Sequence, residues 1–535
     1  MINHTSKQAA QDAIEWALTH GMALKTTPYS AVHTAFSLTP TAISTARYNK
    51  LTASVGLLGK LIHLVSENHD FLSQAIAPIT KGDPFFNALL EMHQAIHLTN
   101  QQHTQQAPQS AKRMPLLIMR SDFMDDAALG PKLIEFNGIA AGMGPFGQRI
   151  HELHKFLQLQ APEAFNEWSA LVSTTNAPLA SANTKLVANH ALANLAQGIA
   201  KATFKINAEF AAIETTTTAQ NQHERGLKTD PVKTSALLTQ PINNNLSNSA
   251  TFLMVVQANE DNVYDQHLLE QALQAKGIRT IRRTFRELHG KLSTGANDRL
   301  ILEGVGSIDS VYLRAGYQYC DYHAHDLISK VCCESLMQTR IFIEKHRVAI
   351  NATVSQQLAT SKRVQMLLSS MTSEQLTAFG LTLDEASNVK QLLGEMRPVT
   401  TDSAAFISQT TAEQWVLKNQ GEGGGHCIFD DDILPKLLSL KPDEYQAWSL
   451  MRRLKPTPRS TPALTVRKGE LQQVEDLISE IGMFTVHIDG KPAISALNGE
   501  QQAYAGYLIR SKSARTTEGG VHSGMGVLDS LVFSD

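Results

Sequence analysis

A lysine at the end of a predicted strand leads directly into a glycine-rich loop in the segment WVLKNQGEGGGHCIF, residues 415–429. Glycines let the backbone approach a ligand closely and point several N–H groups at phosphate oxygens. Lys418 can add positive charge to such a phosphate site, and Glu422 can reach a magnesium ion held on the same phosphates. Taken alone, this loop is equally compatible with a flexible turn between two strands.

Two further segments carry side chains suited to a magnesium–phosphate site. In KLIEFNG, residues 132–138, Glu135 and Asn137 lie two apart on a predicted strand and therefore face the same way. Two oxygen ligands on one face suit a hard cation that keeps some waters and shares substrate phosphates. A solvated strand face is the alternative. Lys362 opens a predicted helix in QQLATSKRVQ, where it either meets a phosphate or lies on the surface as an ordinary lysine.

Arginines mark the ends of several predicted strands. Arg510 and Lys512 lie two apart in YLIRSKSARTTEGGVHSGMG, ahead of a glycine pair. The guanidinium fork matches a substrate carboxylate, whereas a lysine suits a phosphate. Arg120 in MRSD and Arg314 in LRAGY also leave strand ends, where ligands of α/β sheets gather. Each of these arginines is unremarkable by itself.

The elements that must position these side chains follow from hydrophobic periodicity. Residues 1–110 have helical spacing, as in AIEWALTHGMAL and LTASVGLLGKLIHLV. Two strands are predicted next, PLLIMRSDFM and KLIEFNG, separated by a short acidic turn. The helix RIHELHKFLQLQ follows, and further helix is expected to about residue 206. Residues 214–250 are rich in Thr, Asn and Gln and predict a polar surface insertion.

From residue 251 the pattern alternates between strand and helix. TFLMVVQ, TIRRTF and VYLRAGY predict strands, and HLLEQALQAKG predicts a helix that ends in a C-cap glycine. This alternation predicts a small, mostly parallel sheet covered by helices. The last third carries the predicted strands QWVLKNQ, MFTVHID and PAISALNG.

Composition narrows the classes of protein. The chain has 535 residues and a formal net charge of −3, so neither nucleic acid nor an anionic membrane is an expected partner. Apolar runs stay well short of the roughly 20 residues that span a bilayer, and the N-terminus lacks a signal-peptide h-region. A cytoplasmic location is therefore expected. The four cysteines form no CxxC pair and are expected to be free thiols: Cys320, Cys332, Cys333 and Cys427.

Together, these segments resemble the eukaryotic-type glutathione synthetase family of ATP-grasp ligases, from about residue 10 to residue 530. The most specific elements are LIEFN, DQ within NVYDQ, IRRTF, QLATSKRVQ, VLKNQGEGGG, ISEIGMF and the IRSK…GGV…VLD tail. The resemblance implies an α/β (α+β) ATP-grasp fold with a helical N-terminal region and a glycine-rich lid. Residues 1–250 and 362–535 would form the core, and residues 251–361 an inserted parallel α/β substrate-binding subdomain.

The resemblance also implies roles for individual residues. The resemblance implies two Mg²⁺ ions, with ATP as co-substrate, and Glu135, Asn137 and Glu422 as the metal ligands. ATP would be bound by Glu135, Lys362, Lys418, Gly421, Glu422, Gly423, Gly424, Gly425, Cys427, Phe429, Met451, Leu454, Glu480, Lys512 and Glu518. The γ-glutamylcysteine and amino-acid sites would use Arg120, Ala140, Ala141, Gly142, Asn262, Gln266, Arg314, Tyr317, Arg510, Val521 and His522. Arg314, Arg510 and Lys418 would act in catalysis.

The implied reaction joins γ-glutamylcysteine to glycine through an acylphosphate, and family members are typically homodimers. Some positions depart from the family pattern. Ala140 and Gly142 stand where the family usually has serines, and His522 stands where a glycine-specific enzyme has a small residue. A different acceptor amino acid is therefore one alternative. A catalytically silent homologue is another, although the chain keeps its metal-ligand candidates and the lysines Lys362, Lys418 and Lys512.

Overall fold

The computed structural model describes most of the chain. The described residues are 2–97, 112–170, 185–225, 249–324, 326, 329–421, 427–459, 462–496, 499–516, 520–521 and 525–535. Within these ranges, the side chains of 169–170, 214–225 and 329–334 are not described.

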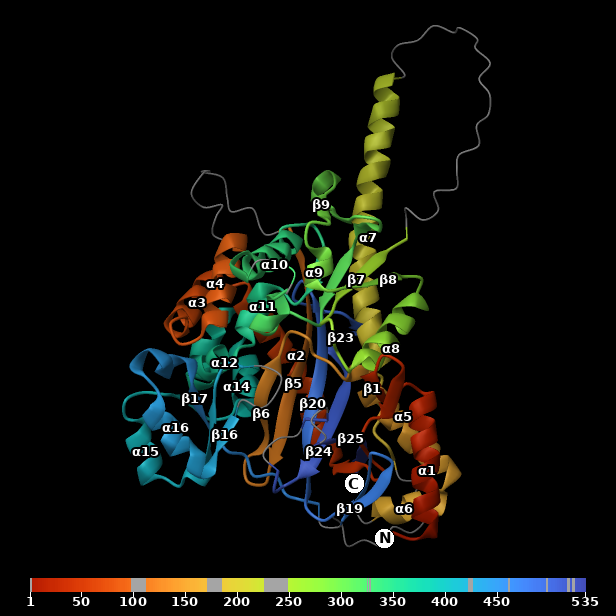
Figure 1. Ribbon diagram of the computed structural model, residues 1–535, viewed down its shortest axis with the longest axis vertical. Coiled ribbons are helices and arrows are strands. Elements are labelled where there is room, and N and C mark those ends of the chain that lie inside the picture. Colours follow the sequence, from red (N-terminus) through yellow and green to blue (C-terminus); the bar gives the residue numbers. More distant parts are fainter. Residues whose placement is uncertain are drawn as a thin grey trace.

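One large mixed sheet runs through the molecule (Figure 1), in the order β19-β18-β3-β25-β24-β20-β5-β13-β12-β7-β8, with β6 beside β5 and β21 beside β20. Its strands are β3 (Phe36–Ser37), β5 (Met114–Asp126), β6 (Gly130–Asn137), β7 (Thr251–Val255), β8 (Arg279–Arg283), β12 (Ser310–Leu313), β13 (Ala349–Asn351), β18 (Ala463–Arg467), β19 (Glu470–Val474), β20 (Leu477–Ile488), β21 (Lys491–Pro492), β24 (Tyr504–Ser513) and β25 (Val527–Asp529).

The sheet changes character at β5. On one side, β5 pairs antiparallel with β6 and β20, and β20 pairs antiparallel with β24. On the other side, β13, β12, β7 and β8 follow β5 with parallel pairing throughout. The parallel strands predicted from residue 251 onward are therefore confirmed, and they continue the antiparallel strands in one sheet.

Helices cover both faces of this sheet. Residues along β5 alternate between the two resulting cores: Leu117, Met119 and Phe123 pack into one, while Leu116 and Ile118 pack into the other. The first core includes α2 (Thr45–Ser66), α3 (His69–Ile76), α4 (Pro84–His97), α10 (Ser329–Glu344), α11 (Val354–Ala359), α12 (Lys362–Ser370), α13 (Ser373–Leu376) and α14 (Leu383–Leu392). The second includes α1 (His4–Thr19), α5 (Gly144–Gln160), α6 (Pro162–Ala170), α7 (Ala191–Arg225) and α8 (Val263–Gln274).

A separate small lobe carries the lysine of the predicted glycine-rich loop. It is a four-stranded sheet in the order β14-β17-β15-β16, composed of β14 (Met396–Pro398), β17 (Ser449–Arg452), β15 (Trp415–Lys418) and β16 (Cys427–Phe429). The helices α15 (Ser403–Gln409) and α16 (Ile433–Ser439) pack on it around Trp415 and Leu417. Other short elements are α9 (Phe285–Leu288), β9 (Leu292–Thr294), β10 (Leu300–Leu302), β11 (Gly306–Ile308), β22 (Ile494–Ser495), β23 (Gln501–Gln502) and β26 (Leu531–Phe533).

The helical expectation for residues 1–110 is wrong between residues 23 and 43. Four short strands lie there: β1 (Ala23–Thr27), β2 (Ser30–His33), β3 and β4 (Thr41–Ile43). The turn at Pro28 and Tyr29 interrupts helix formation, and the β-branched residues on either side suit the β1–β2 hairpin. The polar insertion is helical at its start, because α7 continues to Arg225.

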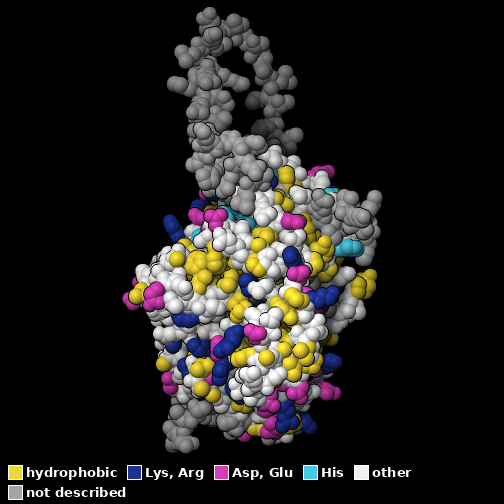
Figure 2. Space-filling view, turned by 90° about the vertical axis from the view of Figure 1, so that its left-hand side faces the viewer, with side chains coloured by type: hydrophobic (Ala, Val, Ile, Leu, Met, Phe, Trp, Pro, Cys, Tyr) yellow, Lys and Arg dark blue, Asp and Glu magenta, His cyan; other side chains and the backbone are white. Residues whose placement is uncertain are grey.

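Viewed from the side of α3, α4, α15 and α16, basic and acidic side chains are interspersed with hydrophobic ones (Figure 2). Among the described residues, none of the helices is both long and apolar enough to cross a membrane.

Candidate active site

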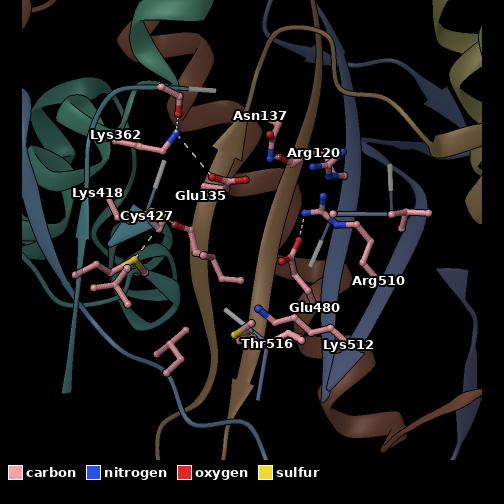
Figure 3. A pocket seen from close by; sticks show the side chains of 18 of the residues that line it. Arg120, Glu135, Asn137, Lys362, Lys418, Cys427, Glu480, Arg510, Lys512 and Thr516 are labelled. Atoms are coloured by element: carbon pink, nitrogen blue, oxygen red, sulfur yellow. Dashed lines mark hydrogen bonds and ion pairs between the residues drawn. The ribbon is translucent and has the colours of Figure 1, made fainter. Parts of the chain in front are cut away.

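A pocket of about 800 Å³ lies between the small lobe and the antiparallel part of the large sheet. Figure 3 shows Lys362, Lys418 and Cys427 on one side of this pocket and Arg120, Arg510, Glu480 and Lys512 on the other. The strand β6 runs between the two groups and carries Glu135 and Asn137. The pocket therefore brings together groups separated by almost 400 positions along the chain.

On the small-lobe side of the pocket, two lysines lie at the ends of secondary-structure elements. Lys362 is the first residue of α12, whose Ser361 N-cap accepts a hydrogen bond from Val364 N. Its Nζ donates to the carbonyl oxygen of Gly421 at 2.8 Å and lies 3.8 Å from Glu135 Oε2. Lys418 ends β15, and its Nζ donates to the carbonyl oxygen of Ile134 at 3.1 Å.

These lysines control the charge of Glu135. Burial acts to raise the pKa of this carboxyl, but the nearby cations outweigh it and lower the pKa to about 2, led by Lys362 and Lys418 with contributions from Arg510 and Arg120. Glu135 is therefore a carboxylate at neutral pH.

A buried carboxylate organises the opposite side. Asp122 on β5 is fully buried and accepts two hydrogen bonds from Arg120, at 2.6 and 2.8 Å. It also accepts from Arg510 at 3.0 Å and from Asn137 Nδ2 at 2.9 Å. Arg510 forms a second ion pair with Glu480. Burial raises the pKa of Glu480, and Arg510 opposes this shift.

Asp122 was not among the predicted site residues. The available signal was its spacing: it lies two residues after Arg120 on a strand, so both side chains face the same way. The register of β5 against β6 places Asp122 opposite Glu135, and that pairing is a tertiary feature.

Arg314 enters the pocket from the end of the parallel strand β12. Its Nη1 donates to Asp265 Oδ2 at 3.1 Å, and its Nη2 lies 3.5 Å from Glu260 Oε1. Burial lowers the pKa of Arg314, but Glu260 and Asp265 raise it overall, so the guanidinium keeps its charge. Gly142 lies against this group: a Cβ added there would be 2.6 Å from Arg314 Nη2. A serine at this position would therefore displace the arginine.

One end of the pocket is lined by the hairpin β15–β16, by β17 and by the chain that follows β17. Met451 on β17 lies 3.9 Å from Lys418 Nζ through its sulfur atom. The guanidinium of Arg453 lies 5.5 Å from the centre of the Phe429 ring and pairs with Asp430. Together with Arg453, Arg452 and Lys455 give this end of the pocket a basic lining.

The donor set fits a hard divalent cation. Glu135 contributes a carboxylate, and Asn137 contributes an amide whose Nδ2 is held by Asp122. Oxygen donors of this kind on adjacent same-face positions suit Mg²⁺ bound jointly by protein and phosphate oxygens. The third predicted ligand, Glu422, lies outside the described residues.

The structure brings most of the predicted residues together. Those that line the pocket are Arg120, Glu135, Asn137, Ala140, Gly142, Asn262, Arg314, Tyr317, Lys362, Lys418, Gly421, Cys427, Phe429, Met451, Leu454, Glu480, Arg510, Lys512 and Val521. Those that lie outside the described residues are Glu422, Gly423, Gly424, Gly425, Glu518 and His522.

Two predicted residues lie apart from the described pocket lining. Gln266 is fully buried on α8, where it contacts Glu260 and accepts from Arg282 Nη2 at 2.5 Å. It thus holds the carboxylate that faces Arg314. Ala141 is also buried, and its carbonyl oxygen accepts a hydrogen bond from the Tyr312 hydroxyl at 3.2 Å.

Comparison with known proteins agrees with this geometry. A family model for the eukaryotic glutathione synthase ATP-binding domain matches residues 3–533. The chloroplastic glutathione synthetase of Solanum lycopersicum is 26% identical over 98% of this chain and 84% of its own length. The Homo sapiens glutathione synthetase is 26% identical over 98% of this chain and 96% of its own length.

A solved structure shows the same fold. The apo form of a glutathione synthetase-like effector from Globodera pallida matches with a TM-score of 0.65 at 16% identity, covering 100% of this chain and 98% of the effector. Because the family model spans nearly the whole sequence, this chain belongs to the eukaryotic glutathione synthase family.

Proposed function

We propose that this chain is a glutathione synthetase, an ATP-dependent ligase that joins γ-glutamylcysteine to glycine and releases ADP and phosphate. The observation that carries this proposal is the division of one pocket into two kinds of site. Lys362, Lys418 and Glu135 suit a metal-bound triphosphate, whereas Arg120 and Arg510 suit the carboxylates of a peptide.

The reaction needs no protein nucleophile. The C-terminal carboxylate of the dipeptide attacks the γ-phosphorus of ATP, forming an acylphosphate and releasing ADP. The amino group of glycine then attacks the acyl carbon, a tetrahedral intermediate forms, and phosphate leaves as the amide bond is completed. Positioning and charge neutralisation supply the catalysis in such a reaction.

The roles of the residues follow from where they lie. Lys362 and Lys418 neutralise phosphate oxygens, and Arg314 and Arg510 orient the reacting carboxylate and stabilise charge that develops on it. The carboxylates of Asp122, Glu260 and Asp265 fix these arginines in place. Glu135 and Asn137 would hold Mg²⁺, which supplies charge neutralisation at the phosphates. Glu422 completes this set in the family pattern.

Departures from the family pattern bear on the dipeptide site and on the acceptor loop. Ala140 and Gly142 remove hydroxyl donors that the family usually offers the dipeptide, and His522 adds bulk in the acceptor loop. An acceptor other than glycine is the alternative within the same mechanism. We further propose a homodimer, a cytoplasmic location and a substrate-binding subdomain at residues 251–361, all by family analogy.

The test is ADP release by purified protein with Mg-ATP and γ-glutamylcysteine, with and without glycine, followed by mass spectrometry of the products. Glycine-dependent ADP release with a glutathione product is the expected result. Release that requires γ-glutamylcysteine but responds better to alanine or serine would keep the mechanism and change the acceptor. Absence of turnover with any small amino acid would overturn the assignment.

A further inference from the structure

Three histidines meet where α3 and α4 pack together, away from the pocket. His69 is the first residue of α3, while His93 and His97 lie one turn apart on the same face of α4. One ring nitrogen from each histidine lies within 4.8 Å of the other two. The ring centroids of His69 and His97 are 3.8 Å apart, and those of His93 and His97 are 4.9 Å apart.

Lone pairs are available at this cluster. His69 Nδ1 and His93 Nε2 are buried and have no hydrogen-bond partner among the described residues. Ser355 Oγ lies 3.2 Å from both His93 Nδ1 and His97 Nε2. Because a hydroxyl oxygen can accept two hydrogen bonds, Ser355 can hold both N–H groups. The opposite nitrogens of these two rings then carry lone pairs, an arrangement typical of metal-binding histidines.

The local electrostatics keep these imidazoles neutral. Burial lowers the pKa of His93 to about 3, the His69 ring adds to this effect, and the His69 backbone partly offsets it. Burial also lowers the pKa of His69 and of His97. Arg113 acts in the same direction on all three, but it is itself paired with Glu67 at 3.1 Å and lies 3.7 Å from Glu344. Neutral imidazole is the form that binds a metal.

We propose that His69, His93 and His97 form a binding site for a divalent transition metal, with Zn²⁺ as the best-fitting ion. Imidazole nitrogens are preferred ligands of Zn²⁺, and a water molecule or hydroxide would complete a tetrahedral set. Zn–N bonds of about 2.0–2.1 Å require nitrogens roughly 3.3 Å apart, so the three rings must close by about 1–1.5 Å. The planes of the His69 and His97 rings are stacked 18° apart, so at least one of these half-buried side chains would have to rotate for both lone pairs to point at one ion.

The helical pair lacks the glutamate that serves as general base in a hydrolytic zinc site. His93 and His97 share the i, i+4 spacing of the HExxH motif, but Gln94 stands where that motif has its glutamate base. The bound ion would connect α3 to α4 and, through Ser355, both helices to α11, which packs against them. The helix α12, which begins at Lys362, follows α11 directly. A bound ion would therefore stabilise the helices that position Lys362, the lysine proposed to bind phosphate.

The experiment is a calorimetric titration of the full-length, tag-free protein with Zn²⁺ in saturating Mg²⁺, with Co²⁺ absorption as a spectroscopic report of tetrahedral coordination. His69→Gln and His97→Gln alter half-buried positions, and His151→Gln is the matched control because it also removes a buried neutral imidazole. Ser355→Ala tests the hydrogen bonds that orient the rings. Circular dichroism of each variant verifies folding.

We expect about one tight Zn²⁺ per wild-type chain and a Zn²⁺-dependent rise in Tm. His69→Gln and His97→Gln should each weaken that binding by at least about 100-fold, and Ser355→Ala by about 10–100-fold. His151→Gln should bind as the wild type does. Equal Zn²⁺ affinity in the wild type and in both folded cluster variants would overturn the proposal. So would failure of the wild type to bind Zn²⁺. Either result is independent of the ligase assay.

Discussion

Replacing Arg510 by glutamine separates a catalytic contribution from a structural one. Arg510 is paired with Asp122 at 3.0 Å, where an effective dielectric of about 20 gives roughly 5.5 kcal/mol of attraction. Removing one partner of a buried pair costs about 3–5 kcal/mol. Asp122 keeps both hydrogen bonds from Arg120, and Glu480 can take up a proton because burial raises its pKa. We therefore expect Arg510→Gln to lower the free energy of unfolding by about 3 kcal/mol, the lower limit of that range.

In the folded Arg510→Gln variant, kcat should still fall, and by more than in a control variant that loses similar stability. Loss of one group that stabilises developing charge lowers kcat by about 10²–10³-fold, and we expect that range for Arg510→Gln. The matched control is Arg459→Gln, which breaks a buried ion pair with Asp529. Arg459 is not among the described residues that line the pocket. It should lose similar stability and retain kcat within about tenfold. Urea unfolding and steady-state ADP release measure both quantities. Equal kcat losses in the two folded variants would refute a catalytic role for Arg510.

Three further predictions address the rest of the pocket and the core. Lys362→Met should lower kcat/KM for ATP by about 10–100-fold, since a charge-assisted hydrogen bond contributes about 1.5–3 kcal/mol; Lys60→Met, at a surface ion pair, should leave it unchanged. Gly142→Ser should raise KM for γ-glutamylcysteine and spare that for ATP, because its Cβ would press on Arg314; unaltered dipeptide kinetics would contradict this. Burial lowers the pKa of His487 to about 4, so stability is lost as pH falls from about 6.5 towards 4, by about 1.4 kcal/mol per pH unit. His487→Leu should flatten the measured dependence of unfolding free energy on pH by about one proton, and an unchanged slope would argue against a buried neutral imidazole.

Local spacing was enough to predict several parts of the site. Glu135 and Asn137 share a strand face because side chains alternate with a period of two, and β6 places them together in the pocket. Lys362 begins a helix behind the capping serine Ser361, as its sequence context predicts. These features depend on neighbours within a few residues, so the sequence carries them directly.

Other parts depended on contacts between distant segments. Asp122 became a central carboxylate only because β5 lies between β6 and β20, which brings Arg510 and Asn137 to it. The contacts of Gln266 with Glu260 and Arg282 likewise depend on the packing of α8. Short strands between residues 23 and 43 replaced the predicted helix because β3 finds pairing partners in β18 and β25.

The amino-acid sequence by itself determined the family, the strand that carries Lys418, the helix that begins at Lys362, and the shared strand face of Glu135 and Asn137 on β6. Each of these features depends on residue type and on spacing between residues close in the sequence. The tertiary structure alone decided which carboxylates fix the arginines and which histidine joins His93 and His97. His69 lies on a different helix from that pair, and no local periodicity records a contact between separate helices. Packing of the helices against the sheet creates that contact, and so only the folded chain shows it.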